Sequence, residues 1–108
     1  MRILLDTCTF LANEIYLSPV SAWEIVVKHS LGRLTLPEPP HRFVPRQREL
    51  HDVAPLPLDE DAVLTLGRLP EYHKDPFDRM LVCQALAHGL TVLTPDAQIS
   101  QYPVQTTW

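Results

Sequence analysis

The sequence has few of the features that mark several large classes of protein. It contains two cysteines, Cys8 and Cys83, without a CxxC pair or a Cys/His zinc spacing, so we interpret both as reduced packing residues. Its 3 glycines form no glycine-rich loop for a phosphate. No apolar run approaches the roughly 18 residues that a membrane helix needs. The N-terminus lacks a basic segment followed by an apolar one, so we expect no signal peptide and a cytoplasmic location.

Basic residues are also too few for a protein that binds nucleic acid through a broad positive face. Lysine and arginine number 9 against 13 acidic residues, which gives a formal net charge of −4. This balance still allows an enzyme that reaches phosphates through metal ions. The length of 108 residues and the 45% hydrophobic content indicate a single globular domain. The 11 prolines, about twice the usual share, mark short loops throughout the chain.

An unbroken apolar run, Ile3 to Leu5, is followed by Asp6 and Thr7. Such a run is typical of a strand that is covered on both faces, as in a parallel sheet. Ligands of these sheets bind just beyond the carboxyl ends of the strands, which is where Asp6 would lie. Taken alone, Asp6 is more simply interpreted as a turn residue or a helix cap.

The junction between this strand and the next one is unusually short. Residues 14–17, EIYL, predict a second strand. Two parallel strands normally need a crossover of roughly a dozen residues or more, usually with a helix. Therefore these two segments pair antiparallel or bend apart, or a connecting helix is absent from this chain.

A helix is predicted over residues 20–34. Ser21 is a suitable N-cap, Glu24 follows at the spacing of a capping box, and Gly32 is a natural terminator. A capping box would account for Glu24 without a catalytic or metal-binding role. A second, short helix is predicted over residues 41–50. The segment 53–58 is extended, but its prolines exclude a central strand.

The second half predicts helices that are capped by acids. Asp59 begins one that runs to about residue 69. In the next, Asp75 is the cap, Pro76 the first residue and Asp78 the third, and a glycine at position 89 ends it. A strand over residues 91–94 then leads to Asp96, and residues 103–108 suit an edge strand.

Four acids share a position in this scheme: Asp6, Glu24, Asp78 and Asp96. Two follow strands and two lie near helix starts, and these ends meet at one edge of an α/β sheet. Carboxylates that converge repel one another unless protons or cations neutralise them, and Mg²⁺ and Mn²⁺ prefer oxygen ligands. Two such ions, about 3.5 to 4 Å apart, can activate water and stabilise the leaving oxygen of a phosphodiester.

The motifs around these acids resemble a known family. MRILLDTCTFL, SPVSAWEI, HKDPFDRMLVCQA and LTPDAQI are similar to the four acidic motifs of PIN domains, above all the VapC-type endoribonuclease toxins of bacterial toxin–antitoxin pairs. The likeness covers nearly the whole chain in the family's order, and DPFDRMLVCQA is its most specific part. It implies a three-layer α/β/α fold with a central, mostly parallel sheet, and Mg²⁺- or Mn²⁺-dependent cleavage of RNA.

The resemblance also assigns residues. Carried over by motif, the catalytic and metal-binding acids are Asp6, Glu24, Asp78 and Asp96. Within this set, Asp6 and Asp78 are the primary metal ligands, Glu24 binds a metal or orients its water, and Asp96 completes the cluster. Thr7 and Thr94 are polar groups that hold the carboxylates in place, whereas Asp75 remains a helix cap.

The family further implies a cognate antitoxin, whose tail occupies a groove near the site, and a homodimer. The expected products are a 5′-phosphate and a 3′-hydroxyl. This chain departs from the pattern where LANE joins the first two motifs, since the family usually carries a longer segment with the first helix there. We therefore expect a PIN-like fold without its first crossover helix. We make no prediction of where the dimer and antitoxin surfaces lie.

Other interpretations compete with the nuclease. The shortened domain could be a catalytically impaired interaction module that binds an antitoxin or another protein. A phospho-receiver domain would have paired acids after the first strand and a lysine after a late strand, but the only lysines are Lys28 and Lys74. A DNA-directed nuclease fits the same cluster, which does not read the 2′-hydroxyl. Four arginines are either phosphate contacts or a solvated surface: Arg42, Arg46, Arg48 and Arg79.

Overall fold

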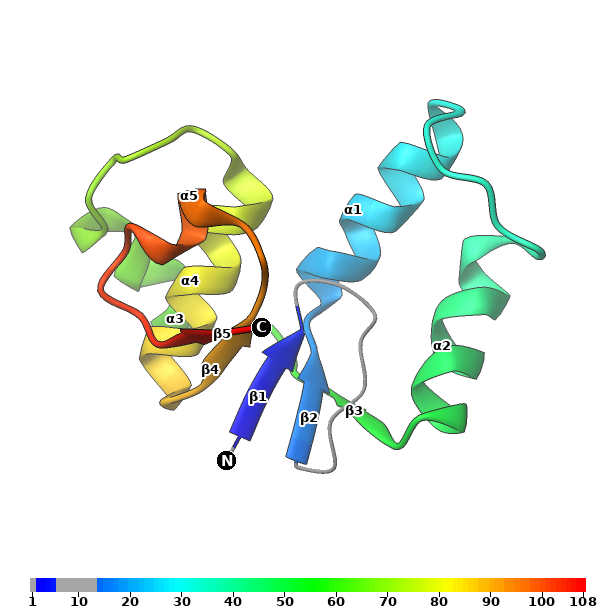
Figure 1. Cartoon of the computed structure of the whole chain (residues 1–108), viewed down its shortest axis with the longest axis horizontal. Helices are drawn as coiled ribbons and strands as arrows, with labels where there is room; N and C mark the ends of the chain where they lie inside the picture. The colour runs from blue at the N-terminus through cyan, green and yellow to red at the C-terminus, as the bar shows by residue number, and fades with distance from the viewer. Residues whose placement is uncertain (1, 6–13) are drawn as a thin grey trace.

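The protein folds around one five-stranded sheet. The structure, a computed structural model, describes residues 2–5 and 14–108 (Figure 1). Along the chain the strands are β1 (Arg2–Leu5), β2 (Glu14–Leu17), β3 (Val53–Pro55), β4 (Thr91–Leu93) and β5 (Thr106–Thr107). Their order across the sheet is β3-β2-β1-β4-β5, and every neighbouring pair is parallel. The predicted α/β fold with a parallel sheet is confirmed.

The first two strands pair in parallel, with Arg2 opposite Glu14 and Leu4 opposite Tyr16. Of the two alternatives for this junction, antiparallel or diverging strands is therefore wrong. Parallel pairing is favoured because both strands are apolar and central, and a sheet buried on both faces is the usual setting of parallel strands. Residues 6–13 connect them and lie outside the described part, and so does the crossover in which a helix was expected to be missing.

Both faces of the sheet are buried at its centre. Along β2, Ile15 and Leu17 point to one face and Tyr16 to the other, because side chains alternate along a strand. Ile15 and Leu17 pack with Val53 and Leu93, while Tyr16 packs against a larger cluster. The larger cluster is built from both strands and helices, and its members with no measurable exposure include Leu4, Leu81, Val82, Cys83, Val92 and Ile99.

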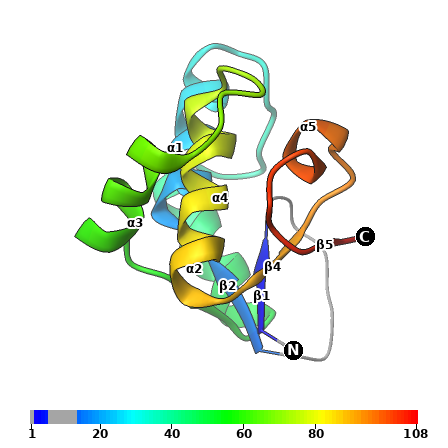
Figure 2. The same ribbon diagram turned by 90° about the vertical axis from the view of Figure 1, so that its left-hand side faces the viewer.

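The helices are α1 (Pro19–Ser30), α2 (Pro40–Leu50), α3 (Glu60–Thr65), α4 (Pro76–His88) and α5 (Ala97–Ser100), with a 3₁₀ turn, η1 (Leu66–Arg68). α4 packs against both α1 and α3, and Figure 2 shows α4 and α5 to either side of β1. No helix in the described part of the chain is long and apolar enough to cross a membrane.

Most predicted elements are present, with shifted ends. α1 ends at Ser30, four residues before the predicted end, and Gly32 adopts a φ of 71° just after it. The helix after Asp59 tightens into η1, so α3 is shorter than predicted. The strands β3 and β5 lie at the two edges, as the prolines and the weak C-terminal alternation predicted.

Cys83 is a buried packing residue, as predicted. Its thiol is free and has no measurable exposure, and burial raises the pKa of this thiol. The other cysteine, Cys8, lies outside the described residues.

Candidate active site

Glu24 comes from the second turn of α1, which begins directly after β2. The N-cap of α1 is Ser18, whose hydroxyl oxygen accepts the backbone N–H of Val20 at 3.0 Å. The predicted cap, Ser21, instead lies inside the first turn, so Glu24 is too far along the helix for a capping box. The Glu24 carboxylate forms an ion pair with Lys28, at 3.2 Å between Oε2 and Nζ. The capping interpretation of Glu24 is therefore wrong.

Asp78 comes from the first turn of α4. This helix leads straight into β4, so its amino end lies at the edge where the parallel strands end. Asp75 caps it as predicted, because its Oδ1 accepts the backbone N–H groups of Phe77 at 2.9 Å and Asp78 at 3.1 Å. The Asp78 carboxylate therefore does not cap the helix. Its Oδ2 lies 3.1 Å from Nε2 of His73.

Asp96 follows β4 and has a local role as well. Its Oδ1 accepts the backbone N–H of Gln98 at 2.9 Å and so caps the four-residue helix α5. The Thr94 hydroxyl is buried and accepts the backbone N–H of Asp96 at 3.0 Å. Thr94 thus fixes the backbone that carries the Asp96 carboxylate.

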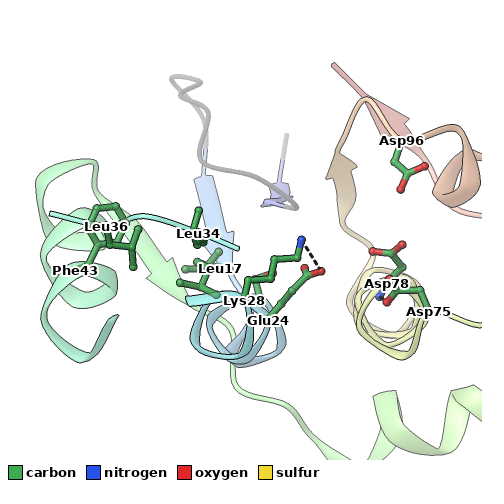
Figure 3. Close-up of a pocket in the computed structure, with 11 residues that line it drawn as sticks. Leu17, Glu24, Lys28, Leu34, Leu36, Phe43, Asp75, Asp78 and Asp96 are labelled. Carbon is green, nitrogen blue, oxygen red and sulfur yellow. Dashed lines mark hydrogen bonds and ion pairs between the residues drawn. The ribbon is translucent and has the colours of Figure 1, made fainter. Parts of the chain in front are cut away.

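Three of the four predicted acids line one cleft. Glu24, Asp78 and Asp96 border a cavity of about 480 Å³, together with Lys28 and Asp75. Leu34, Leu36 and Phe43 lie on the side away from Asp78 and Asp96 (Figure 3), and Leu17 and Ile25 line the cavity as well. Figure 3 shows the Asp78 and Asp96 carboxylates pointing toward one another, and Glu24 reaching toward them from α1. The cleft therefore joins an acidic wall to an apolar one.

The donor set of this cleft suits a hard divalent cation, because its carboxylates offer only oxygen ligands. Within the described residues, however, no three or more Asp, Glu, His or Cys side chains are grouped closely enough to hold a metal ion. Glu24 is engaged by Lys28, and Asp78 by His73. Asp6 and Thr7 lie outside the described part. The described acids alone therefore do not form a complete metal site.

Lys28, a positively charged residue that borders the cleft, was not identified from the sequence. Its spacing of four residues from Glu24 on one helix is a signal that could have identified it. The arginines suggested for phosphate contact are not among the described lining residues of the cleft. Arg46 pairs with Glu38 at 3.1 Å, and Arg79 donates to the carbonyl of His73 at 3.4 Å.

Comparison with known proteins agrees with this architecture. A family model described as the PIN domain matches residues 3–105. Ribonuclease VapC16 of Mycobacterium tuberculosis (strain ATCC 25618 / H37Rv) is 43% identical over 47 residues. That match covers 44% of this chain and 33% of the relative, so it spans about a third of the relative's length.

Solved structures show the same fold at low sequence identity. VapBC2 from Rickettsia felis, bound to a DNA fragment from its promoter, has a chain with a TM-score of 0.71 and 12% identity, covering 99% of this chain and 98% of that one. FitAcB from Neisseria gonorrhoeae has a chain with a TM-score of 0.66 and 17% identity, covering 100% and 97%. Since the family model spans nearly the whole sequence, the chain belongs to the PIN domain family.

Proposed function

We propose that this chain is a metal-dependent endoribonuclease and acts as the toxin of a toxin–antitoxin pair. The observation that carries the proposal is the gathering of Glu24, Asp78 and Asp96, from three separate elements, along one cleft at the carboxyl edge of a parallel sheet. Helix capping explains the Asp96 carboxylate in part, but it explains neither Glu24 nor Asp78.

Each acid has a proposed role. Asp78 and Asp6 would hold Mg²⁺ or Mn²⁺, Glu24 would bind the ion or orient its water, and Asp96 would complete the cluster. When bound, the ion lowers the pKa of a water molecule and neutralises charge on the phosphodiester. Thr94 keeps the backbone of Asp96 in place, and Thr7 is proposed to do the same for Asp6.

RNA is the proposed substrate because the relative from Mycobacterium tuberculosis is named a ribonuclease. An antitoxin partner is proposed because chains of the same fold occur in the VapBC2 and FitAcB structures. A homodimer and a cytoplasmic location belong to the same proposal. The expected cleavage leaves a 5′-phosphate and a 3′-hydroxyl.

The decisive experiment is an RNA cleavage assay with the purified chain over a series of Mg²⁺ and Mn²⁺ concentrations. Glu24→Gln, Asp78→Asn and Asp96→Asn should each reduce cleavage, and EDTA should abolish it. Asp61→Asn is the matched control, because Asp61 is an exposed acid on α3 that is not among the described lining residues of the cleft. A substrate with 2′-deoxy sugars separates an RNase from a DNA-directed enzyme.

The second candidate, a non-catalytic interaction module, is favoured by the ion pair that engages Glu24. It predicts that the chain binds an antitoxin while it leaves RNA intact at every metal concentration. Cleavage that persists in all three acid variants would show a contaminating nuclease and would overturn the enzyme proposal.

A further inference from the structure

His73 lies between the Asp78 carboxylate and a buried tyrosine. Its Nε2 is 3.1 Å from Oδ2 of Asp78, and its Nδ1 is 2.7 Å from the hydroxyl of Tyr102. The side chains of His73 and Asp78 are 13% and 12% exposed, so water competes little for these bonds. His73 precedes Asp78 by five residues, whereas Tyr102 is 29 residues away from His73.

The distances around Tyr102 favour one direction for the hydrogen bonds that run from Tyr102 through His73 to Asp78. The backbone N–H of His73 donates to the Tyr102 oxygen at 3.3 Å. The phenol has one proton of its own, and its shortest acceptor is Nδ1 of His73 at 2.7 Å, compared with 3.4 Å for the His73 carbonyl. With Nδ1 accepting, the neutral imidazole carries its proton on Nε2, and that proton is donated to Asp78.

The hydrogen-bonded residues Tyr102, His73 and Asp78 are held in place by packing in the core. Tyr102 is 3% exposed, and its ring packs edge-on against Tyr72, with centroids 5.1 Å apart. Arg79, one turn into α4, donates to the carbonyls of Pro70 and His73 at 3.4 Å. The segment before α4 is thus fixed at several points, and the imidazole is held against Asp78.

We propose that His73 and Tyr102 are positioning residues for the Asp78 carboxylate. This inference rests on the proposed function, in which Asp78 is a metal ligand. Carboxylates that bind metals are oriented by hydrogen bonds from outside the ligand set, and loss of such a partner weakens metal affinity by about 10- to 100-fold. Tyr102 acts one step farther away, because it fixes the tautomer and orientation of His73.

The test measures Mn²⁺ affinity of the purified chain by electron paramagnetic resonance, apart from any activity. His73→Asn lacks a donor that reaches Asp78 and should weaken Mn²⁺ binding about 10-fold. His73→Gln places an amide donor near the Nε2 position and should restore most of that affinity. Tyr102→Phe, which removes one hydroxyl, should weaken binding by a smaller factor. Tyr72→Phe is the matched control and should bind as the unaltered chain does.

Two further measurements keep the outcomes distinct. Thermal melting in EDTA shows whether Tyr102→Phe is folded, and if it is not, the Asn and Gln variants at position 73 decide alone. Nitrogen-15 NMR at alkaline pH should show His73 protonated on Nε2, with a mixture of tautomers in Tyr102→Phe. Equal Mn²⁺ affinity in all variants, or protonation on Nδ1, overturns the positioning role while leaving the nuclease intact. An unaltered chain that neither binds Mn²⁺ nor cleaves RNA overturns both.

Discussion

The hydroxyl of Ser18 donates a hydrogen bond to the side-chain carbonyl of Gln84, and both residues are buried. The same hydroxyl accepts the backbone N–H of Val20 at the start of α1. The Gln84 amide donates to the carbonyl of Leu56 at 3.3 Å and lies 3.5 Å from that of Pro57. The hydrogen bond between Ser18 and Gln84 therefore links α1, which carries Glu24, to α4, which carries Asp78. Both acids line the cleft.

Replacement of Gln84 by leucine should therefore destabilise the protein. The change leaves a buried hydroxyl and backbone carbonyls without their partner, which costs roughly 2–3 kcal/mol in the free energy of unfolding. Urea unfolding followed by circular dichroism measures this loss. Gln101→Leu, at an exposed position, should change the free energy by less than about 0.5 kcal/mol. Equal midpoints for the two variants would contradict the linking role of Gln84.

The two acids at the start of α4 should respond differently to neutralisation. Asp75→Asn keeps a side-chain oxygen for the N–H groups of Phe77 and Asp78, and asparagine caps helices about as well as aspartate. Its melting temperature and RNA cleavage should stay close to those of the unaltered chain. Asp78→Asn removes a proposed ligand and should slow cleavage by more than about 100-fold. The assay is a single-turnover rate on a fluorescent RNA, and equal losses would show that Asp75 also takes part.

Local chemistry explains which parts of the fold could be predicted. The start of α4 is specified by Asp75 and Pro76 together, since one caps the helix and the other is favoured at its first position. Position 18 carries the same kind of signal, because Pro19 follows a serine there. The capping-box spacing to Glu24 predicts Ser21 for that role, but the Ser18-Pro19 signal is the stronger one.

Long-range contacts explain which parts of the site could not be predicted. The sequence places all four acids beside a predicted strand end or helix start, and three of them line the cleft. Nothing near Tyr102 in the sequence points to His73, because only tertiary packing brings them together. Likewise, the parallel pairing of β1 with β2 depends on burial of both faces, which a short connection does not reveal.

Asp59 should make stability depend on acid pH. Its pKa is lowered from 3.8, chiefly because its carboxylate accepts the backbone N–H of Ala62, with a further contribution from His88. A lowered folded-state pKa means that this stabilisation is present above pH 3.8 and is lost as the pH falls through the folded-state value. Asp59→Asn retains the cap without the charge, so its melting temperature should fall less on acidification.

Melting curves from neutral pH to below the unfolded-state value of Asp59 measure this difference. Asp61→Asn is the matched control, because it removes an exposed acid from the same first turn and keeps Asp59 intact. Its profile should follow that of the unaltered chain. If Asp59→Asn and Asp61→Asn gave parallel profiles, the contribution assigned to the Asp59 carboxylate would be wrong.

Lys28 should compete with a metal ion for Glu24. Their ion pair is 3.2 Å long, and the Lys28 side chain is 54% exposed, so the pair contributes only about 0.2–1 kcal/mol. Lys28→Met removes this competitor for the Glu24 carboxylate and should raise Mn²⁺ affinity by about 2- to 5-fold. Lys74→Met, at an exposed lysine that is not among the described lining residues, is the control.

The gain should vanish when Glu24→Gln is already present, because the two side chains then no longer interact as ions. A gain that survives in that background would show that Lys28 acts on the cleft through its charge alone, and a loss of affinity would show that it supports the site.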